Sequence, residues 1–171
     1  GVGTFVRSYK DTGLWNRFQK FMRKDGRLPV FESNPLRLEI IPAPENVAEK
    51  MKIMPGDPVI RCLRDMSDNG ERTGVDVAYL DLATFRDLKI EDLEDVKGNL
   101  YKLYEEKLGV FIADVTDILE FVIVDKEIQK ICDLPLGTPL FFVTRQSRLL
   151  NKKTVEIRYE YCSAVNYRLR I

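Results

Sequence analysis

Two charged residues of opposite sign stand in a stretch that otherwise alternates between apolar and polar side chains. Residues 58–81 contain Asn69-Gly70, which favours a tight hairpin turn because both residues tolerate positive φ. The alternation predicts two antiparallel strands, with Arg64 on the first and Asp76 on the second. A guanidinium and a carboxylate placed in this way form either a cross-strand ion pair at a sheet edge or the polar floor of a small-molecule site. These residues alone leave both interpretations open.

The composition excludes several kinds of chemistry. Lys plus Arg and Asp plus Glu both number 27 among 171 residues, so the chain has no basic surplus with which to bind nucleic acid itself. It has no histidine, which removes His-based catalytic triads and most zinc sites. Cys62, Cys132 and Cys162 lack Cys-x-x-Cys spacing, so we expect buried thiols in a reducing compartment. We therefore predict no catalytic residue, no metal site and no cofactor.

Length and hydropathy predict a single domain with at most a short appendage. No segment reaches the roughly 20 apolar residues that a membrane helix needs. The N-terminus is glycine-rich and soon becomes polar, unlike a signal peptide. We expect a cytoplasmic protein without a membrane partner.

Hydrophobic periodicity assigns the other elements. Leu14, Phe18 and Phe21 recur at helical spacing, which predicts a helix over residues 14–24 that ends at Gly26. Further helices are predicted over residues 44–51, over 99–108 and from Asp125, strands over 36–40, 110–124, 139–150 and 154–169, and irregular chain over 28–35.

One order of elements occurs twice along the chain. A short helix, a Pro/Gly turn and a long hairpin follow one another at residues 44–81 and again at 126–169. This duplication predicts two similar halves that share one sheet. Because strands dominate and the neighbouring strands are hairpins, the sheet should be antiparallel and the class α+β, with helices at the periphery.

Three acids are spaced through the predicted strand 110–124, namely Asp114, Asp117 and Glu120. Three carboxylates at this spacing are one possible calcium site. Their spacing lacks the glycine and the closing glutamate of a calcium loop. We therefore favour a solvated strand face.

Several short motifs, taken in order, resemble a known family. They are Ala43-Pro-Glu-Asn-Val-Ala48, Pro55-Gly-Asp-Pro-Val-Ile60, Asn99-Leu-Tyr101, Leu136-Gly-Thr-Pro-Leu140, Arg145, Val155-Glu156 and Tyr167-Arg168. Together they resemble the UTRA domain, the effector-binding domain of HutC-type members of the GntR family of transcription regulators. Gly1-Val-Gly-Thr-Phe-Val6 resembles the end of the wing of that family's DNA-binding winged helix.

The resemblance implies a chorismate-lyase-like α+β fold, with a mixed or antiparallel sheet and peripheral helices. It divides the chain into residues 1–8, the tail of a missing winged-helix domain and its linker, and residues 9–171, the effector-binding and dimerisation domain. It implies a homodimer that binds a small effector. DNA would be bound through the missing N-terminal domain and not through this chain.

The family's site residues carry over position by position. A serine before the first hairpin is matched by Ser33, and the first arginine of an Arg-x-Arg pattern by Arg64. A Ser-x-Tyr at a helix start is matched by Asn99 and Tyr101. Three positions depart from the pattern: Met66 replaces the second arginine, Asp76 a glutamate and Cys162 a tyrosine. The expected effector-binding residues are Ser33, Arg64, Met66, Asp76, Asn99, Tyr101, Glu156 and Cys162.

These departures bear on the effector. Sugar-phosphate-sensing members carry two arginines, and two guanidinium groups hold a phosphate dianion best. With Met66 in place of one of them, we expect an organic acid or a sugar derivative with a single acid group. Arg64 would bind that group, Asp76 and Glu156 would bind hydroxyls or amines, and neutral hydrogen bonds would come from Ser33, Asn99 and Tyr101. Local alternatives are an Asn99 helix cap, a core Tyr101 and an Arg64–Asp76 pair.

Three functions follow as hypotheses. The first is the effector-binding and dimerisation module of a bacterial transcription regulator, which is not an enzyme. The alternative is a chorismate-lyase-like enzyme acting on a small carboxylate, because the fold is shared and that reaction needs little acid–base machinery. The third is a dimerisation domain whose pocket has collapsed.

Overall fold

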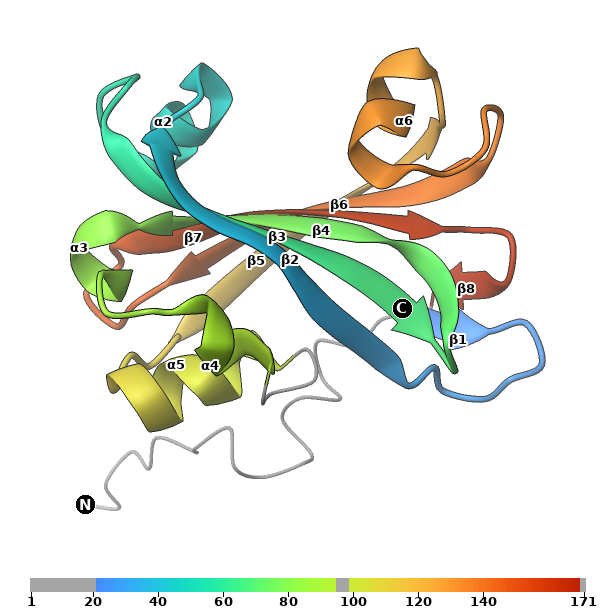
Figure 1. Cartoon of the computed structure of the whole chain (residues 1–171), viewed down its shortest axis with the longest axis horizontal. Helices are drawn as coiled ribbons and strands as arrows, with labels where there is room; N and C mark the ends of the chain where they lie inside the picture. The colour runs from blue at the N-terminus through green and yellow to red at the C-terminus, as the bar shows by residue number, and fades with distance from the viewer. Residues whose placement is uncertain (1–20, 95–98, 170–171) are drawn as a thin grey trace, which may run out of the picture.

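The computed structural model describes residues 21–94 and 99–169, and its centre is a six-stranded antiparallel sheet (Figure 1). In spatial order the strands are β2 (Phe31–Pro42), β3 (Pro58–Asp68), β4 (Glu71–Asp81), β7 (Thr154–Ser163), β6 (Pro139–Arg148) and β5 (Asp114–Ile123). A second sheet pairs β1 (Phe21–Arg23) with β8 (Tyr167–Leu169). The helices are α2 (Glu45–Met51), α3 (Leu82–Phe85), α4 (Ile90–Glu94), α5 (Leu100–Leu108) and α6 (Lys126–Cys132). The predicted α+β class and antiparallel sheet are confirmed.

The predicted pair of similar halves is visible in the topology. One unit is β2-α2-β3-β4 and the other is β5-α6-β6-β7. The two hairpins meet where β4 pairs with β7, so β2 and β5 form the two outer edges of the sheet. Helices α2 and α6 lie on the same face, above the sheet in Figure 1. The two units therefore share one sheet, as the duplicated order of elements predicts.

The first hairpin turns where the sequence predicts. Asn69 and Gly70 both have positive φ, of 53° and 79°. Positive φ at both central residues twists the turn in the same sense as the strands. The turn therefore aligns β3 with β4 so that Arg64 lies opposite Asp76.

Apolar side chains cover both faces of the sheet at its ends. On one face α2 and α6 bury apolar residues of the central strands. On the other, α3, α4 and α5 cover one end of the sheet with Phe85, Leu93 and Tyr104. The β1–β8 pair covers the opposite end with Phe21 and Tyr167. The stretch of this face between the two apolar ends is where the polar side chains gather.

Helix capping follows the predicted residues. The Asn99 side chain accepts a hydrogen bond from the backbone N–H of Lys102 at 3.1 Å, and Asp125 caps α6 in the same way. Gly109 ends α5 in the left-handed conformation, with φ 65°. These groups satisfy backbone atoms that the first and last turns leave without partners.

Two local predictions are wrong. The end of the helix expected over residues 14–24 is strand β1, because Phe21 buries its ring against Phe141 and the β1 backbone pairs with β8. Residues 14–20 of that helix and the motif at residues 1–6 lie outside the described part of the chain. The stretch 28–35 is not irregular throughout, since β2 begins at Phe31 and pairs with β3 from that residue. In both places a distant strand supplies hydrogen bonds that local spacing does not reveal.

The three cysteines are buried and free, which confirms the prediction of buried thiols. In the described ranges no helix is long and apolar enough to cross a membrane.

Gly74 lies at a very close approach of two strands. A Cβ built on Gly74 would fall 1.7 Å from the backbone carbonyl oxygen of Tyr161. No side-chain rotation can relieve a contact with backbone. We expect Gly74→Ala to lower the free energy of unfolding by about 3 kcal/mol, since β4 and β7 must separate. Gly56→Ala is the control: its Cβ meets nothing within 4 Å, so only its positive φ costs stability, about 1 kcal/mol. Urea unfolding measures both, and equal losses would contradict the prediction.

Asp68 joins the β1–β8 pair to the tip of the first hairpin. Its carboxylate accepts hydrogen bonds from Arg23 Nε at 2.8 Å, from the Tyr167 hydroxyl at 2.8 Å and from the Val30 N–H at 3.1 Å. Burial opposes ionisation, but these donors outweigh it and lower the pKa of Asp68. The ionised carboxylate thus holds three separate segments together.

The lowered pKa makes this tie sensitive to acid. Because the folded-state pKa lies below the unfolded one, its contribution to stability is present above the ordinary aspartate pKa and is lost as pH falls through the folded value. We expect Asp68→Asn to be less stable than wild type at neutral pH and to converge toward it in acid. Unfolding curves across an acid series test this, with the exposed Asp87→Asn as control. A constant difference at every pH would contradict it.

Candidate functional site

A belt of charged side chains crosses the sheet between its two apolar ends. The strand registers build it in two steps. Arg64 lies opposite Asp76, and Asp76 opposite Glu160. Arg158 is two residues from Glu160 on β7. It lies opposite Arg145 of β6, and Arg145 lies opposite Asp117 of β5. Glu156 is two residues from Arg158 on β7 and therefore points to the same face. The charged belt is defined as Arg64, Asp76, Asp117, Arg145, Glu156, Arg158 and Glu160.

Arg64 and Asp76 form a buried ion pair. Arg64 Nε donates to Asp76 Oδ1 at 2.9 Å, and a second, shorter bond joins Nη2 to Oδ2. Both residues are 2% exposed. The predicted cross-strand pair is therefore present, but its predicted place at a sheet edge is wrong, because β2 and β7 flank the hairpin on both sides.

Arg145 connects the belt to the outer strand β5. Its Nε and Nη2 donate to the two carboxylate oxygens of Asp117 at 2.7 and 2.9 Å. Glu160 lies further away, 3.9 Å from Arg145 and 3.7 Å from Arg158. This corrects the expectation of a solvated strand face for Asp117, whose side chain is 7% exposed. Since side chains alternate along β5, Asp114 and Glu120 point to the opposite face.

Glu156 is the most enclosed member of the belt, with no exposed surface. Its carboxylate accepts hydrogen bonds from Arg158 Nη2 at 2.7 Å, from the Tyr104 hydroxyl at 2.7 Å and from Ser147 Oγ at 3.1 Å. The Tyr101 hydroxyl lies 2.8 Å from Ser147 Oγ, and Arg158 sits over the Tyr101 ring at 5.3 Å. Arg158 Nε is buried and has no hydrogen-bond partner among the described residues.

The environment determines which of these groups are charged. Burial opposes ionisation of Glu156, but the Arg158 charge and the Tyr104 hydrogen bond outweigh it and lower the pKa of Glu156. Burial together with the Glu156 charge raises the pKa of Tyr101 to about 12 and that of Tyr104 well above its usual range. The site therefore contains an ionised carboxylate and two neutral phenols at neutral pH.

The other expected site residues fall into two groups. Ser33 lies opposite Met66, and Met66 and Cys162 both lie opposite Gly74, one step from the Arg64–Asp76 pair along the strands. These side chains form a small, mostly apolar border of the belt. Asn99 stands apart as the half-buried cap of α5, the local alternative considered above. The register thus brings six of the eight expected residues to one face, and Tyr101 of α5 reaches the same face through Ser147. Their roles toward a ligand stay predictions.

Four charged members of the belt were not among the expected effector-binding residues, namely Asp117, Arg145, Arg158 and Glu160. Arg145 had been noted only as a family motif and Asp117 only as one of three spaced acids. The duplication contains a signal for one of them. Arg64 follows Pro58 by six residues, and Arg145 follows Pro139 by six residues, so the two arginines hold equivalent places in the two units. Alignment of the halves would have found Arg145. Nothing local marks Arg158 or Glu160.

Within residues 21–94 and 99–169, no group of three or more Cys, Asp or Glu side chains is arranged to hold a metal ion. The acids of the belt are instead matched to arginines. The described belt is therefore a network of ion pairs and hydrogen bonds and not a metal centre.

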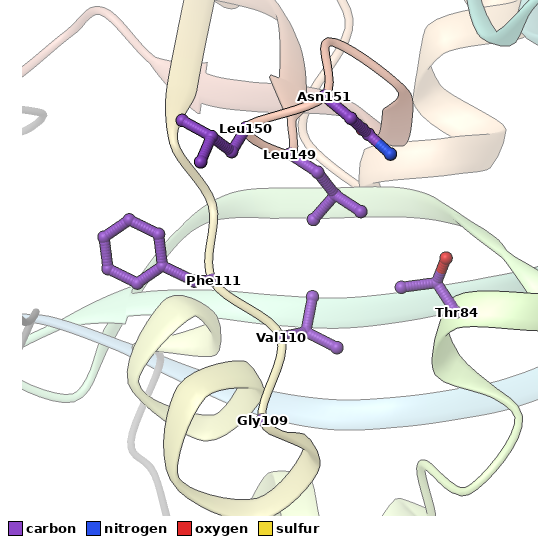
Figure 2. A pocket seen from close by; sticks show the side chains of 7 residues that line it. All are labelled: Thr84, Gly109, Val110, Phe111, Leu149, Leu150 and Asn151. Atoms are coloured by element: carbon purple, nitrogen blue, oxygen red, sulfur yellow. The ribbon is translucent and has the colours of Figure 1, made fainter. Parts of the chain in front are cut away.

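A separate groove of about 530 Å³ lies beyond the end of the sheet (Figure 2). It is formed where α3, the segment after α5 and the β6–β7 turn approach one another. No charged side chain lines it. Its lining residues are Thr84, Gly109, Val110, Phe111, Leu149, Leu150 and Asn151. The groove can hold apolar groups but has few polar atoms to orient a metabolite.

Comparison with known proteins agrees with the fold. The model of the UTRA domain family matches residues 30–168. This chain belongs to the UTRA domain family. Because that match spans most of the chain, the resemblance seen in the short motifs is confirmed at the level of the family.

Relatives and solved structures of this UTRA chain are transcription regulators. The chain is 26% identical over 166 residues to the HTH-type regulator YurK of Bacillus subtilis, covering 95% of this chain and 65% of YurK. It therefore spans less than two thirds of that relative. The ligand-binding domain of a GntR-family regulator from Bordetella bronchiseptica superposes with TM-score 0.81 at 27% identity, covering 91% of this chain and 96% of that one. The effector domain of PhnF from Mycobacterium smegmatis shares the fold, with TM-score 0.64 at 18% identity, covering 78% and 81%.

These relatives favour the transcription-regulator hypothesis over the enzyme hypothesis. The domain is of the transcription-regulator type and is not an enzyme, so the chorismate-lyase-like alternative is disfavoured.

The Arg158–Glu156 pair gives a direct test of the belt. We expect Arg158→Met to lower the free energy of unfolding by about 3–5 kcal/mol, because it leaves a buried carboxylate without its cation. The double variant Arg158→Met/Glu156→Gln should recover much of that loss, since the amide oxygen still accepts from Tyr104. Arg148→Met removes a partly exposed pair with Asp114 and should cost less than about 1 kcal/mol. Chemical denaturation measures all three, and a double variant no more stable than Arg158→Met would refute the pairing.

Proposed function

We propose that this UTRA domain is the effector-binding and dimerisation domain of a HutC-type GntR regulator. A small molecule bound at the charged belt changes DNA binding by an N-terminal winged helix. Residues 1–8 are the tail of that winged-helix domain and its linker, and residues 9–171 are the effector domain. The regulator acts in the cytoplasm as a homodimer, and this chain does not itself bind DNA.

The observation that carries the proposal is the buried charge on one sheet face. Buried ion pairs contribute little net stability relative to apolar residues of the same volume. Three arginines and four acids in the middle of a sheet are therefore costly for a purely structural core. The unpartnered Arg158 Nε is a further donor available to a ligand oxygen. These features favour a ligand-binding face over a collapsed, purely structural one.

The charge balance of the belt bears on the effector. Each arginine already has a carboxylate partner, and the acids outnumber the arginines by one. A phosphate dianion would have to compete with these acids. Beside Arg64, the border formed by Met66 and Cys162 is apolar. We therefore propose an organic acid with one carboxylate, or a hydroxylated sugar derivative, and not a sugar phosphate.

Coupling to DNA follows from differential affinity. The belt takes Arg64 and Asp76 from the first unit of the sheet and its other members from the second. A ligand that contacts both units favours the arrangement in which they fit it best. It alters DNA binding only by the difference between its affinities for the DNA-binding and non-binding arrangements.

A thermal-shift screen tests the site and the effector class together. Organic acids, sugar derivatives and their phosphorylated counterparts are compared on the 171-residue chain. We expect single-acid or hydroxylated compounds to raise Tm by several degrees at saturation, because a ligand that binds only the folded state stabilises it. Stabilisation by phosphorylated sugars alone would overturn the effector class.

Matched variants locate the bound compound. Arg64→Met/Asp76→Leu removes both charges of one buried pair together and should abolish the shift. Arg61→Met is the control, because Arg61 lies on the opposite face of the same strand and pairs with Glu39. A shift that survives in the double variant, or is lost in Arg61→Met, would place the ligand elsewhere.

A further inference from the structure

Glu160 differs from the other acids of the charged belt, because its carboxylate accepts no hydrogen bond from the residues that the structure describes. Its nearest cations are Arg158 at 3.7 Å and Arg145 at 3.9 Å, and both distances exceed the length of a hydrogen bond. Each of the other three acids is held by an arginine at hydrogen-bond distance. Since the belt has four acids and three arginines, Glu160 is the acid without a cation of its own.

The strand register places a second acid against Glu160. Asp76 lies directly opposite Glu160 in the β4–β7 pair, so their Cα atoms are about 4.5–5.5 Å apart and their side chains share one face. Like charges at directly opposed positions are destabilising. Asp76 is neutralised by Arg64, whereas Glu160 has no such partner. A cation beside Glu160 would therefore relieve an unfavourable arrangement without breaking an existing pair.

A buried donor without a partner belongs to the arginine beside this carboxylate. Arg158 donates from Nη2 to Glu156, its Nη1 lies 3.7 Å from Glu160, and its Nε has no acceptor among the described residues. Arg158 is 2% exposed, and a buried donor without an acceptor costs free energy. An oxygen of a bound molecule would satisfy this donor.

Glu160 is also the member of the belt that solvent reaches most easily. Its side chain is 13% exposed, whereas every other member is 7% exposed or less. A molecule that enters the belt from solvent therefore meets this carboxylate first. No group of three acids or thiols in the described ranges is arranged to hold a metal ion. An ammonium group needs less, because one carboxylate and a neighbouring acceptor already satisfy most of its N–H donors.

We propose that Glu160 binds a protonated amino group of the effector, and that Arg158 Nε donates to an oxygen of the same molecule next to that amine. This inference rests on the proposed function and narrows its effector class, because the organic acid or sugar derivative then carries an amine. Such a molecule brings the cation that Glu160 lacks and the acceptor that Arg158 lacks. Its remaining polar groups are left for Arg64 and the rest of the belt.

Small amines test the inference before the effector itself is identified. Ethanolamine combines a protonated amine with a neighbouring oxygen. It is compared, in thermal-shift titrations of the 171-residue chain, with ethylene glycol, which lacks the amine, and with ethylamine, which lacks the oxygen. Sodium chloride keeps the ionic strength constant. We expect ethanolamine at tens of millimolar to raise Tm by a few degrees, ethylamine to raise it less and ethylene glycol to leave it unchanged.

Glu160→Gln locates the amine. The amide keeps the shape of the side chain and removes its charge, so we expect the Kd for ethanolamine to rise about 10- to 100-fold. Glu120→Gln is the matched control, because it removes the same charge from an exposed side chain on the opposite face of the sheet and should leave this Kd unchanged.

The stability of the free variant gives a second measurement. Glu160 accepts no hydrogen bond from the described chain and faces Asp76, so Glu160→Gln should unfold at the temperature of wild type or above it. A large loss of stability would show that the carboxylate already has a structural partner, and it would count against the proposal.

Three binding results would overturn the proposal: equal shifts with ethanolamine and ethylene glycol, no shift with either amine, or a shift that survives in Glu160→Gln. A larger shift with ethylamine than with ethanolamine would overturn the role of Arg158 Nε. None of these results decides the proposed function, which is tested by the metabolite screen and by Arg64→Met/Asp76→Leu. Conversely, an amine shift that is lost in Glu160→Gln, in a protein that no organic acid or sugar derivative stabilises, would support the amine site and count against the proposed effector class.

Discussion

The pairing of three buried arginines with carboxylates is the interaction on which the rest of this domain depends. Two of the pairs, Arg64–Asp76 and Arg145–Asp117, join neighbouring strands, whereas Arg158 and Glu156 lie two residues apart on β7. Slippage of a strand by one residue would move its charge to the opposite, apolar face and leave the partner buried alone. The two cross-strand pairs therefore contribute more to the choice of register than to net stability. They also keep charge on a face that packing alone would fill with apolar side chains.

The duplicated architecture explains how this face is assembled. Each unit brings an arginine to the same place on its second strand, Arg64 in one and Arg145 in the other. The partners of the two arginines differ, because Arg64 pairs with Asp76 on β4 and Arg145 pairs with Asp117 on the edge strand β5. The edges differ too: β2 contains Pro35 and Pro42, whereas β5 contains no proline and pairs with β6 without a register shift.

Much of the fold could be predicted from local signals. Asn69-Gly70 sets the first hairpin, Asn99 and Asp125 begin two helices, and Gly109 ends one, because each acts through its own backbone or a neighbour within a few residues. The failures share one cause. Phe21 has helical spacing with its neighbours, yet it lies in a strand because its partners are Phe141 and the β8 backbone, more than a hundred residues away.

The same distinction separates what the sequence determined from what only the tertiary structure decided. Residue types and spacing determined the α+β class, the opposed Arg64 and Asp76, and the family, since these depend on alternation, turns and short motifs. They did not determine that Asp117 is buried in an ion pair with Arg145, that Glu156 is fully buried, or that Arg158 pairs with Glu156. Burial and ion pairing depend on which strands become neighbours. Strand order is decided by packing of the whole sheet, a property that no local stretch of sequence contains.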